Sequence, residues 1–168
     1  GTMEQLISTP IKGTELILGK FLPYFAIGMT DVLIAVLMGT FLFDVPLRGS
    51  VVLLFVMAGV FLTGVLSLGI LISVVAKNQF LANEIAIVVT FLPAFLLSGF
   101  IYPIENMPVV LQAITVIVPA RYFVEILKGL FLQGVGLSVL WPQLLALVIY
   151  ALLVLYVARR RFKKRLQI

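Results

Sequence analysis

Asp31 is the ionisable side chain best placed to do chemistry in this sequence. It lies near the middle of an apolar run, residues 21–43, where an ionised carboxylate costs about 3 kcal/mol if it faces lipid. Gly28, Ala35 and Gly39 occur at helical spacing around it and predict a face that another helix can approach closely. We therefore expect Asp31 to point into a helix bundle. Two interpretations remain open: a polar contact on a substrate or proton path, or a hydrogen bond between helices.

Other kinds of chemistry are excluded by composition and spacing. The 168 residues contain neither cysteine nor histidine, which excludes disulfides, typical zinc sites and Ser/His/Asp triads. The segment GTELILGK (13–20) has a phosphate-loop-like pattern, but five residues rather than four separate its glycines, and Phe21 stands where Ser or Thr would hold magnesium. We predict no catalytic, metal-binding or cofactor-binding residue, so any ATP must be bound by another chain.

The elements that position Asp31 are predicted to be membrane helices. Hydrophobic residues make up 62% of the chain, charged residues 11%, and the mean hydropathy is +1.24. Runs of this length cover most or all of the ~30 Å hydrocarbon thickness when helical. We predict a single all-α domain, a bundle of four transmembrane helices with spans at residues 21–43, 51–76, 84–100 and 137–158.

Two features inside these spans predict local structure. Pro93 interrupts the third run, where we expect a kink. In the second run Gly59, Thr63 and Ser67 repeat every four residues, and this stripe is interpreted as a surface for close helix packing rather than a substrate groove. Ser50 is expected to cap the start of that second helix.

The stretch between the third and fourth spans, residues 101–136, is predicted to enter and leave the membrane on one side. Pro103 and Pro108 end any continuous helix. The two apolar segments that follow, 107–118 and 122–133, hold 12 residues each and are too short to span a bilayer. We predict an outer re-entrant helical hairpin.

The distribution of basic residues predicts the orientation. The net charge is +5, but six of the twelve Lys and Arg residues lie in the tail 159–168, which is typical of a membrane-flanking anchor in the lipid bilayer and not of nucleic-acid binding. With four spans, nine of the twelve fall on one side, in segments 1–20, 77–84 and the tail, and three fall on the other. Both ends are therefore predicted to be cytoplasmic.

The N-terminal segment, residues 1–20, has no signal-peptide pattern and is expected to come from the middle of a longer protein. Thr2 and Gln5 have capping-box spacing and predict a short cytoplasmic helix over residues 3–8. Pro10 fits the first turn of a second helix. The short helix is interpreted either as a juxtamembrane helix on the lipid headgroups or as a docking helix for a soluble partner.

Three motifs carry a resemblance to a known family. GTMEQLISTPI with GK at 19–20, LLSGFIYPIENMP (96–108) and VPARYF (118–123) occur in that order along the chain. They resemble the coupling helix, the end of the fifth span and the turn of the outer hairpin in the membrane subunit of type-2 ATP-binding-cassette (ABC) exporters. The chain thus resembles the C-terminal half of an ABC transporter permease.

The resemblance implies further partners and roles. It implies six spans per subunit, a second permease subunit in a homo- or heterodimer, ABC ATPase subunits docked on the cytoplasmic side, and a place in the cytoplasmic (inner) membrane. The chain departs from the family by lacking its N-terminal half with the first two spans. The residues implied to contact the ATPase are Glu4, Gln5, Leu6, Ser8, Thr9 and Pro10. The residues implied to form the outer gate are Pro103, Glu105, Pro108, Pro119, Arg121 and Glu125.

Two other functions remain as alternatives. A secondary transporter would use Asp31 as a proton or ion site, and its transport would follow an ion gradient without an ATPase. A non-transporting membrane anchor subunit would show no change in flux when Glu4 or Asp31 is replaced.

Overall fold

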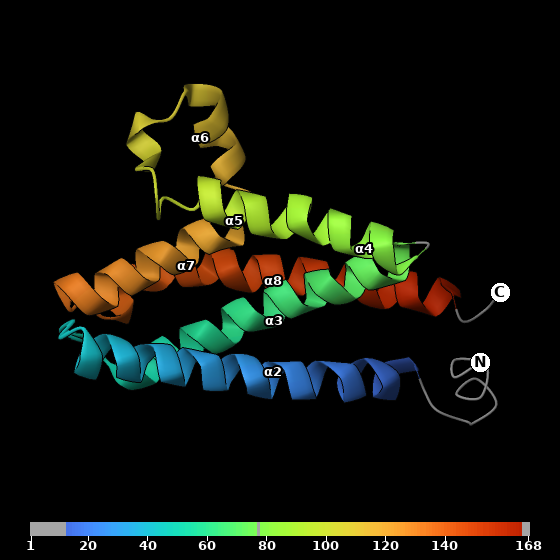
Figure 1. Cartoon of the computed structure of the whole chain (residues 1–168), viewed down its shortest axis with the longest axis horizontal. Helices are drawn as coiled ribbons and strands as arrows, with labels where there is room; N and C mark the ends of the chain where they lie inside the picture. The colour runs from blue at the N-terminus through green and yellow to red at the C-terminus, as the bar shows by residue number, and fades with distance from the viewer. Residues whose placement is uncertain (1–12, 77, 166–168) are drawn as a thin grey trace.

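The computed structural model describes residues 13–76 and 78–165, and every regular element in these ranges is helical (Figure 1). The α-helices are α2 (Gly13–Leu37), α3 (Val51–Val75), α4 (Gln79–Ala86), α5 (Leu92–Leu97), α6 (Val109–Thr115), α7 (Pro119–Lys128) and α8 (Leu137–Arg165). Three π-helical segments, η1 (Met38–Leu42), η2 (Ile87–Phe91) and η4 (Gly129–Gln133), and one 3₁₀ turn, η3 (Ile104–Asn106), complete them. The predicted all-α class is confirmed.

Four helices in the described ranges are long and apolar enough to cross a membrane. They cover Ile17–Leu42, Val51–Val75, Gln79–Leu97 and Leu137–Arg161. The predicted four-helix membrane bundle is therefore confirmed. The first and last helices extend beyond the apolar runs, because a helix can continue its backbone hydrogen bonds in water after the lipid-facing sequence has ended.

Capping residues decide where two spans begin. The Ser50 hydroxyl accepts a hydrogen bond from the backbone N–H of Leu53 at 3.4 Å, as predicted for the start of α3. Asn78 does the same for the third span, because its Oδ1 accepts from the N–H of Leu81 at 2.8 Å. This cap sets the start of α4 at Gln79, whereas hydropathy alone predicted a span beginning at residue 84.

The third span is irregular close to Pro93. The π turn η2 lies between α4 and α5, and the N–H of Leu92 donates to the carbonyl of Ile87 five residues earlier. Pro93 follows in the first turn of α5, where its missing N–H leaves one fewer bond to the preceding turn. The Thr90 hydroxyl donates to the Ala86 carbonyl, one turn earlier in the same span. The local distortion expected at Pro93 thus takes the form of a widened π turn.

The core forms where α3 packs against α8, and α2 and α7 also lie against α3. Its largest fully buried side chains come from three segments: Leu54, Met57, Ile126, Leu130 and Leu147. At Gly64 the two long helices approach so closely that an added Cβ would lie 3.0 Å from Cδ1 of Tyr150. Ser67 is 1% exposed and its hydroxyl donates to its own helix. Gly64 lies outside the predicted stripe; within the stripe, Gly59 faces α2, since an added Cβ would lie 3.6 Å from Phe25 Cζ. Packing as the role of the whole stripe stays a prediction.

One end of the bundle is closed by contacts between two connecting segments. The N–H of Gly49 donates to the Leu130 carbonyl at 2.8 Å, and Arg48 Nη1 donates to the Leu132 carbonyl at 3.4 Å. Gly134 ends the π turn η4 with φ +67°, a left-handed conformation that favours glycine. The start of α2 and the end of α8 lie at the opposite end of the bundle (Figure 1).

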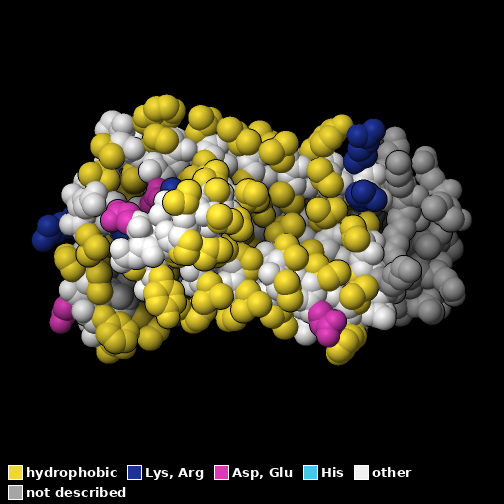
Figure 2. Space-filling model, turned by 90° about the horizontal axis from the view of Figure 1, so that it is seen from above, with side chains coloured by type: hydrophobic (Ala, Val, Ile, Leu, Met, Phe, Trp, Pro, Cys, Tyr) yellow, Lys and Arg dark blue, Asp and Glu magenta, His cyan; other side chains and the backbone are white. Residues whose placement is uncertain are grey.

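The surface of the bundle matches a membrane setting. Hydrophobic side chains cover most of the face in Figure 2, and acidic and basic side chains gather toward the two ends. Many large apolar side chains of all four spans are exposed, among them Phe41, Val52, Val88 and Leu152. The chain is a multi-pass membrane protein.

Candidate functional site

The segment predicted as a re-entrant hairpin forms a sharp elbow. Helices α6 and α7–η4 meet at 86° across residues 116–118. The N–H of Val118 donates to the Thr115 carbonyl at 3.0 Å and closes the last turn of α6. Pro119 then begins α7, where the first helical turn needs no N–H donor from it. In Figure 1 α7 lies along the bundle beside α8, whereas α6 projects away from it.

A polar cluster joins the elbow to the last span. Arg121 Nη1 donates to the Thr115 hydroxyl at 2.6 Å, and Arg121 Nε lies 3.5 Å from Glu125 Oε1. Gln143 Nε2 donates to the other carboxylate oxygen, Glu125 Oε2, at 3.2 Å. The cluster therefore links the end of α6, the first two turns of α7 and the second turn of α8.

The side chains of this polar cluster are buried or partly buried. Thr115 is fully buried, and the side chains of Arg121 and Glu125 are 25% and 38% exposed. Among the residues that the structure describes, Arg121 Nε is in ion-pair range of Glu125 but makes no hydrogen bond, and Gln143 Oε1 has no hydrogen-bond partner. Unpaired polar atoms are uncommon and costly in a packed interior, so these two atoms are candidates for contacts with groups outside the described residues.

A second contact fixes the elbow to the third span. Lys128 Nζ donates to the Gly99 carbonyl at 2.8 Å, which links the end of α7 to the segment just after α5. Gly99 has φ +79°, and an added Cβ would lie 3.1 Å from Ile104 side-chain atoms. Glycine avoids both the strain and the close contact, and it allows the backbone conformation in which the carbonyl accepts from Lys128.

The predicted gate residues divide into two groups. Pro119, Arg121 and Glu125 belong to the elbow and its cluster. The others, Pro103, Glu105 and Pro108, belong to the exposed turn around η3. There Gln112 Nε2 donates to the carbonyls of Met107 at 2.8 Å and Glu105 at 3.4 Å, while the Glu105 side chain is exposed and apart from the cluster.

Sequence reasoning missed Thr115 and Gln143 as members of the cluster. Gln143 could have been noticed as the amide side chain inside the apolar run of the last span. Its partner could not, because Glu125 lies 18 residues earlier on another helix. Thr115 has no such feature, since a threonine in a short apolar helix is common.

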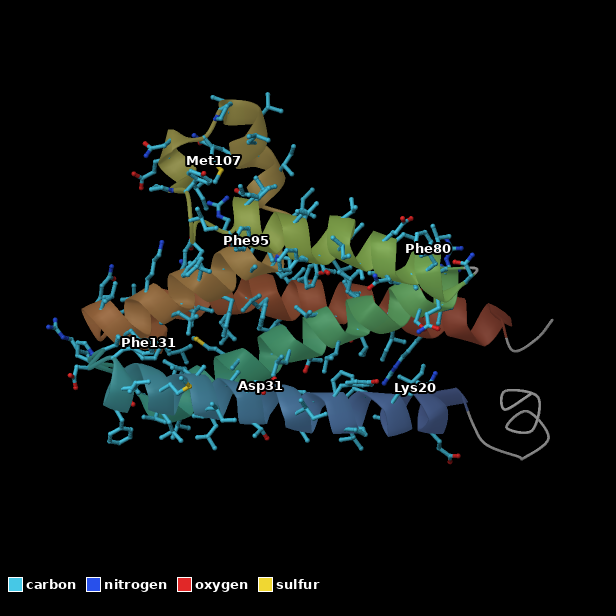
Figure 3. All side chains as sticks on the ribbon, in the orientation of Figure 1. Lys20, Asp31, Phe80, Phe95, Met107 and Phe131 are labelled. Atoms are coloured by element: carbon cyan, nitrogen blue, oxygen red, sulfur yellow. The ribbon has the colours of Figure 1, made fainter. Side chains whose placement is uncertain are left out.

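Asp31 lies on α2, near the middle of the first span, Ile17–Leu42 (Figure 3). It is exposed, so the expectation that it points into the bundle is not met within these four helices. Val32 and Val36 pack against the core instead, and one residue along a helix is a rotation of about 100°. Gly28 does face α3, since an added Cβ would lie 3.0 Å from Leu62 Cδ2. The predicted ATPase-contact residues, Glu4, Gln5, Leu6, Ser8, Thr9 and Pro10, lie outside the described residues.

The sequence comparisons define the class of protein to which these helices belong. Residues 1–132 match the sequence profile of the ABC-2 type transporter family, described as ABC2_membrane. The chain belongs to this family, and it forms part of the membrane-spanning permease of an ABC transporter.

Similar proteins come from bacteria and from an amoeba. The chain is 44% identical over 166 residues to "Probable multidrug ABC transporter permease YbhS" of Escherichia coli (strain K12), which covers 99% of the chain and 44% of that protein. It is 32% identical over 149 residues to "Probable multidrug ABC transporter permease YbhR" of the same strain, covering 89% and 40%. It is 24% identical over 160 residues to "ABC transporter G family member 20" of Dictyostelium discoideum, covering 94% and 22%.

The chain thus spans less than half the length of these curated relatives. No solved structure matches it.

Proposed function

We propose that the chain is the C-terminal membrane half of an ABC export permease. In this proposal it moves a substrate out of the cytoplasm with ATP that a separate ATPase subunit hydrolyses, next to a second permease subunit. The single observation that carries the proposal is the match to YbhS over 99% of the chain, because that protein's printed name is that of a probable multidrug ABC transporter permease. The multidrug name also favours export over uptake.

The proposed orientation has both chain ends in the cytoplasm of a cell whose inner membrane holds the protein. The charges of the bundle support it, because Lys20 and the three arginines at 159–161 follow one end of the spans, whereas Arg48 lies at the other. Basic residues are retained on the cytoplasmic side of membrane proteins. The elbow then lies on the outer side.

In the proposed mechanism the N-terminal segment, residues 1–20, transmits the closing of the ATPase to α2. Because α3 packs on both α2 and α8, a shift of α2 reaches the last span through one packed core. Gln143 of α8 holds Glu125 of α7, so movement of α8 is passed to the elbow. The elbow would close the outer mouth in one state and release it in the other.

Asp31 is proposed to face a polar part of the assembled permease. Its side chain is exposed near the middle of the first span, and a carboxylate facing lipid at that depth costs about 3 kcal/mol. A polar contact from outside this chain would remove that cost. A substrate path that runs beside α2 would pass Asp31 at this contact.

The proposal is tested by separating ATPase binding from membrane insertion. In the complete permease, Leu6→Asp should abolish copurification of the ATPase, because a carboxylate replaces the apolar side chain of the proposed docking helix. The protein should remain in the membrane fraction. Asp31→Asn is the matched variant, and it should leave ATPase binding intact while lowering ATP-driven uptake into inverted membrane vesicles.

The outcomes discriminate the alternatives. Wild-type ATPase copurification in the Leu6→Asp variant would contradict the docking assignment. Uptake into vesicles that follows an imposed proton gradient and needs no ATP would instead favour a secondary transporter. Unchanged flux in both variants would favour a membrane anchor.

A further inference from the structure

A cavity of about 630 Å³ lies between α3, the third span, α8 and the elbow. It forms where the third span leaves the bundle: α4 packs on α3, whereas α5 packs on α6 and α7. The π turn η2 and Pro93 interrupt the regular α-helix at this point, and both border the cavity. Most of the lining is apolar, and it includes Phe61, Val65, Ala94, Ile117, Pro119 and Val154.

Two hydroxyl groups supply the polar character of the cavity, and no charged side chain lines it. The Thr90 hydroxyl is already engaged, because it donates to the Ala86 carbonyl of its own helix. The Tyr150 hydroxyl has no hydrogen-bond partner among the residues that the structure describes. Gly64 leaves room for the tyrosine ring to lie against α3, since an added Cβ would be 3.0 Å from Cδ1 of the ring. The Tyr150 hydroxyl is therefore available as a hydrogen-bond donor in an otherwise apolar cavity.

The depth of the cavity restricts what can occupy it. Tyr150 is 13 residues after Leu137, the first residue of α8, and at 1.5 Å per residue it lies about 20 Å from that end. Thr90 is likewise near the middle of the third span, Gln79–Leu97. A phospholipid keeps its charged headgroup at the interface and cannot bring it to this depth without a large desolvation cost. The part of a molecule that occupies the cavity must therefore be uncharged.

We propose that this cavity binds a neutral lipophilic small molecule that accepts a hydrogen bond from the Tyr150 hydroxyl. The volume is within the range of about 300–1,000 Å³ that is typical of small-molecule sites, which are mostly apolar with a few polar groups. The ligand enters from the surrounding bilayer, where such molecules concentrate. The proposal concerns binding within this chain and does not depend on how ATP is used.

The test uses the complete permease in lipid nanodiscs and benzophenone as the probe. Benzophenone is neutral and lipophilic, carries one carbonyl acceptor, and forms covalent adducts under ultraviolet light that mass spectrometry can locate. We expect adducts on cavity residues, which include Val65, Ala94 and Val154. The labelling should saturate with probe concentration.

Two variants and one control make the test specific. Tyr150→Phe keeps the ring against Gly64 but removes the donor. It should raise the benzophenone concentration that gives half-maximal labelling by about fivefold, which corresponds to the loss of one hydrogen bond. Ala94→Trp should fill the space and reduce cavity adducts at least tenfold. Leu152→Trp places the same indole on a 62% exposed position of α8 outside the cavity and should leave labelling unchanged.

Three results would overturn the proposal. Equal labelling of the wild type and the Ala94→Trp variant would mean that the cavity is not the site. Unchanged half-saturation in Tyr150→Phe would remove the assigned role of the hydroxyl. Labelling that added phospholipid suppresses, but an unlabelled neutral lipophile does not, would make the occupant a bilayer lipid. None of these results bears on ATPase docking, which the Leu6→Asp variant tests separately.

Discussion

Arg121 of α7 reaches back across the elbow and donates a hydrogen bond of 2.6 Å to the hydroxyl of Thr115 at the end of α6. The donor is a charged guanidinium and the acceptor is fully buried, which makes this a strong, charge-assisted bond. It joins two helices that otherwise diverge at 86°. The elbow is thus held by a specific contact in addition to the backbone turn.

Replacing Thr115 with valine should weaken the elbow. The two side chains have the same shape, so Thr115→Val leaves Arg121 Nη1 without its acceptor, at a cost of about 1.5–3 kcal/mol. It also removes the bond that the hydroxyl donates to the Gln112 carbonyl of its own helix at 2.7 Å, as the control below does for its own helix. We expect the thermal unfolding midpoint of the purified permease in detergent to fall. Thr30→Val is the matched control, because the Thr30 hydroxyl is exposed and bonds only its own helix at 2.8 Å. Equal midpoints for the two variants would contradict the role assigned to the Arg121 bond.

Gly99→Ala should destabilise the connection between the third span and α7. A left-handed backbone at φ +79° costs an alanine about 1–2 kcal/mol, and the new Cβ would press on Ile104. The Gly99 carbonyl would also shift away from Lys128 Nζ. Thermal unfolding can again measure the effect. Gly136→Ala should change little, since no atom lies within 4 Å of its added Cβ, and a comparable loss in both variants would refute the explanation.

The orientation can be measured with single cysteines, because the chain has none of its own. In the complete permease with other cysteines replaced, a membrane-impermeant maleimide should label Arg48→Cys and Glu105→Cys in intact cells. It should label Ile168→Cys only after the cells are opened. Labelling of Ile168→Cys in intact cells would mean that the segment 107–133 crosses the membrane once more.

Hydropathy predicted the number and order of the spans because the free energy of placing a segment in lipid depends on the residues that the segment itself contains. Helix ends followed different rules. The third span begins at Gln79 through the cap of Asn78, and α8 continues into the basic tail as far as Arg165. Capping and backbone hydrogen bonding extend helices beyond the apolar stretch, so hydropathy underestimates their length.

The candidate site was predicted in part. Arg121 and Glu125 were named as gate residues through the resemblance of VPARYF and its surroundings to the outer hairpin of the family. Their joining through Gln143 was not predicted, because it depends on how α7 and α8 lie side by side. Asp31 was identified but assigned the wrong direction within this bundle, because glycines at helical spacing mark a face without fixing its rotation to one residue.

By itself the sequence determined that this is a bundle of four membrane helices with a broken segment before the last span and most of its basic charge on one side. These properties follow from local composition and from the positions of proline. Tertiary structure alone decided the 86° elbow, the link from Glu125 to Gln143 and the cavity beside Tyr150. The reason is that helices that are apolar all round carry no mark of which face meets which neighbour, so packing sets their rotation and the spaces between them.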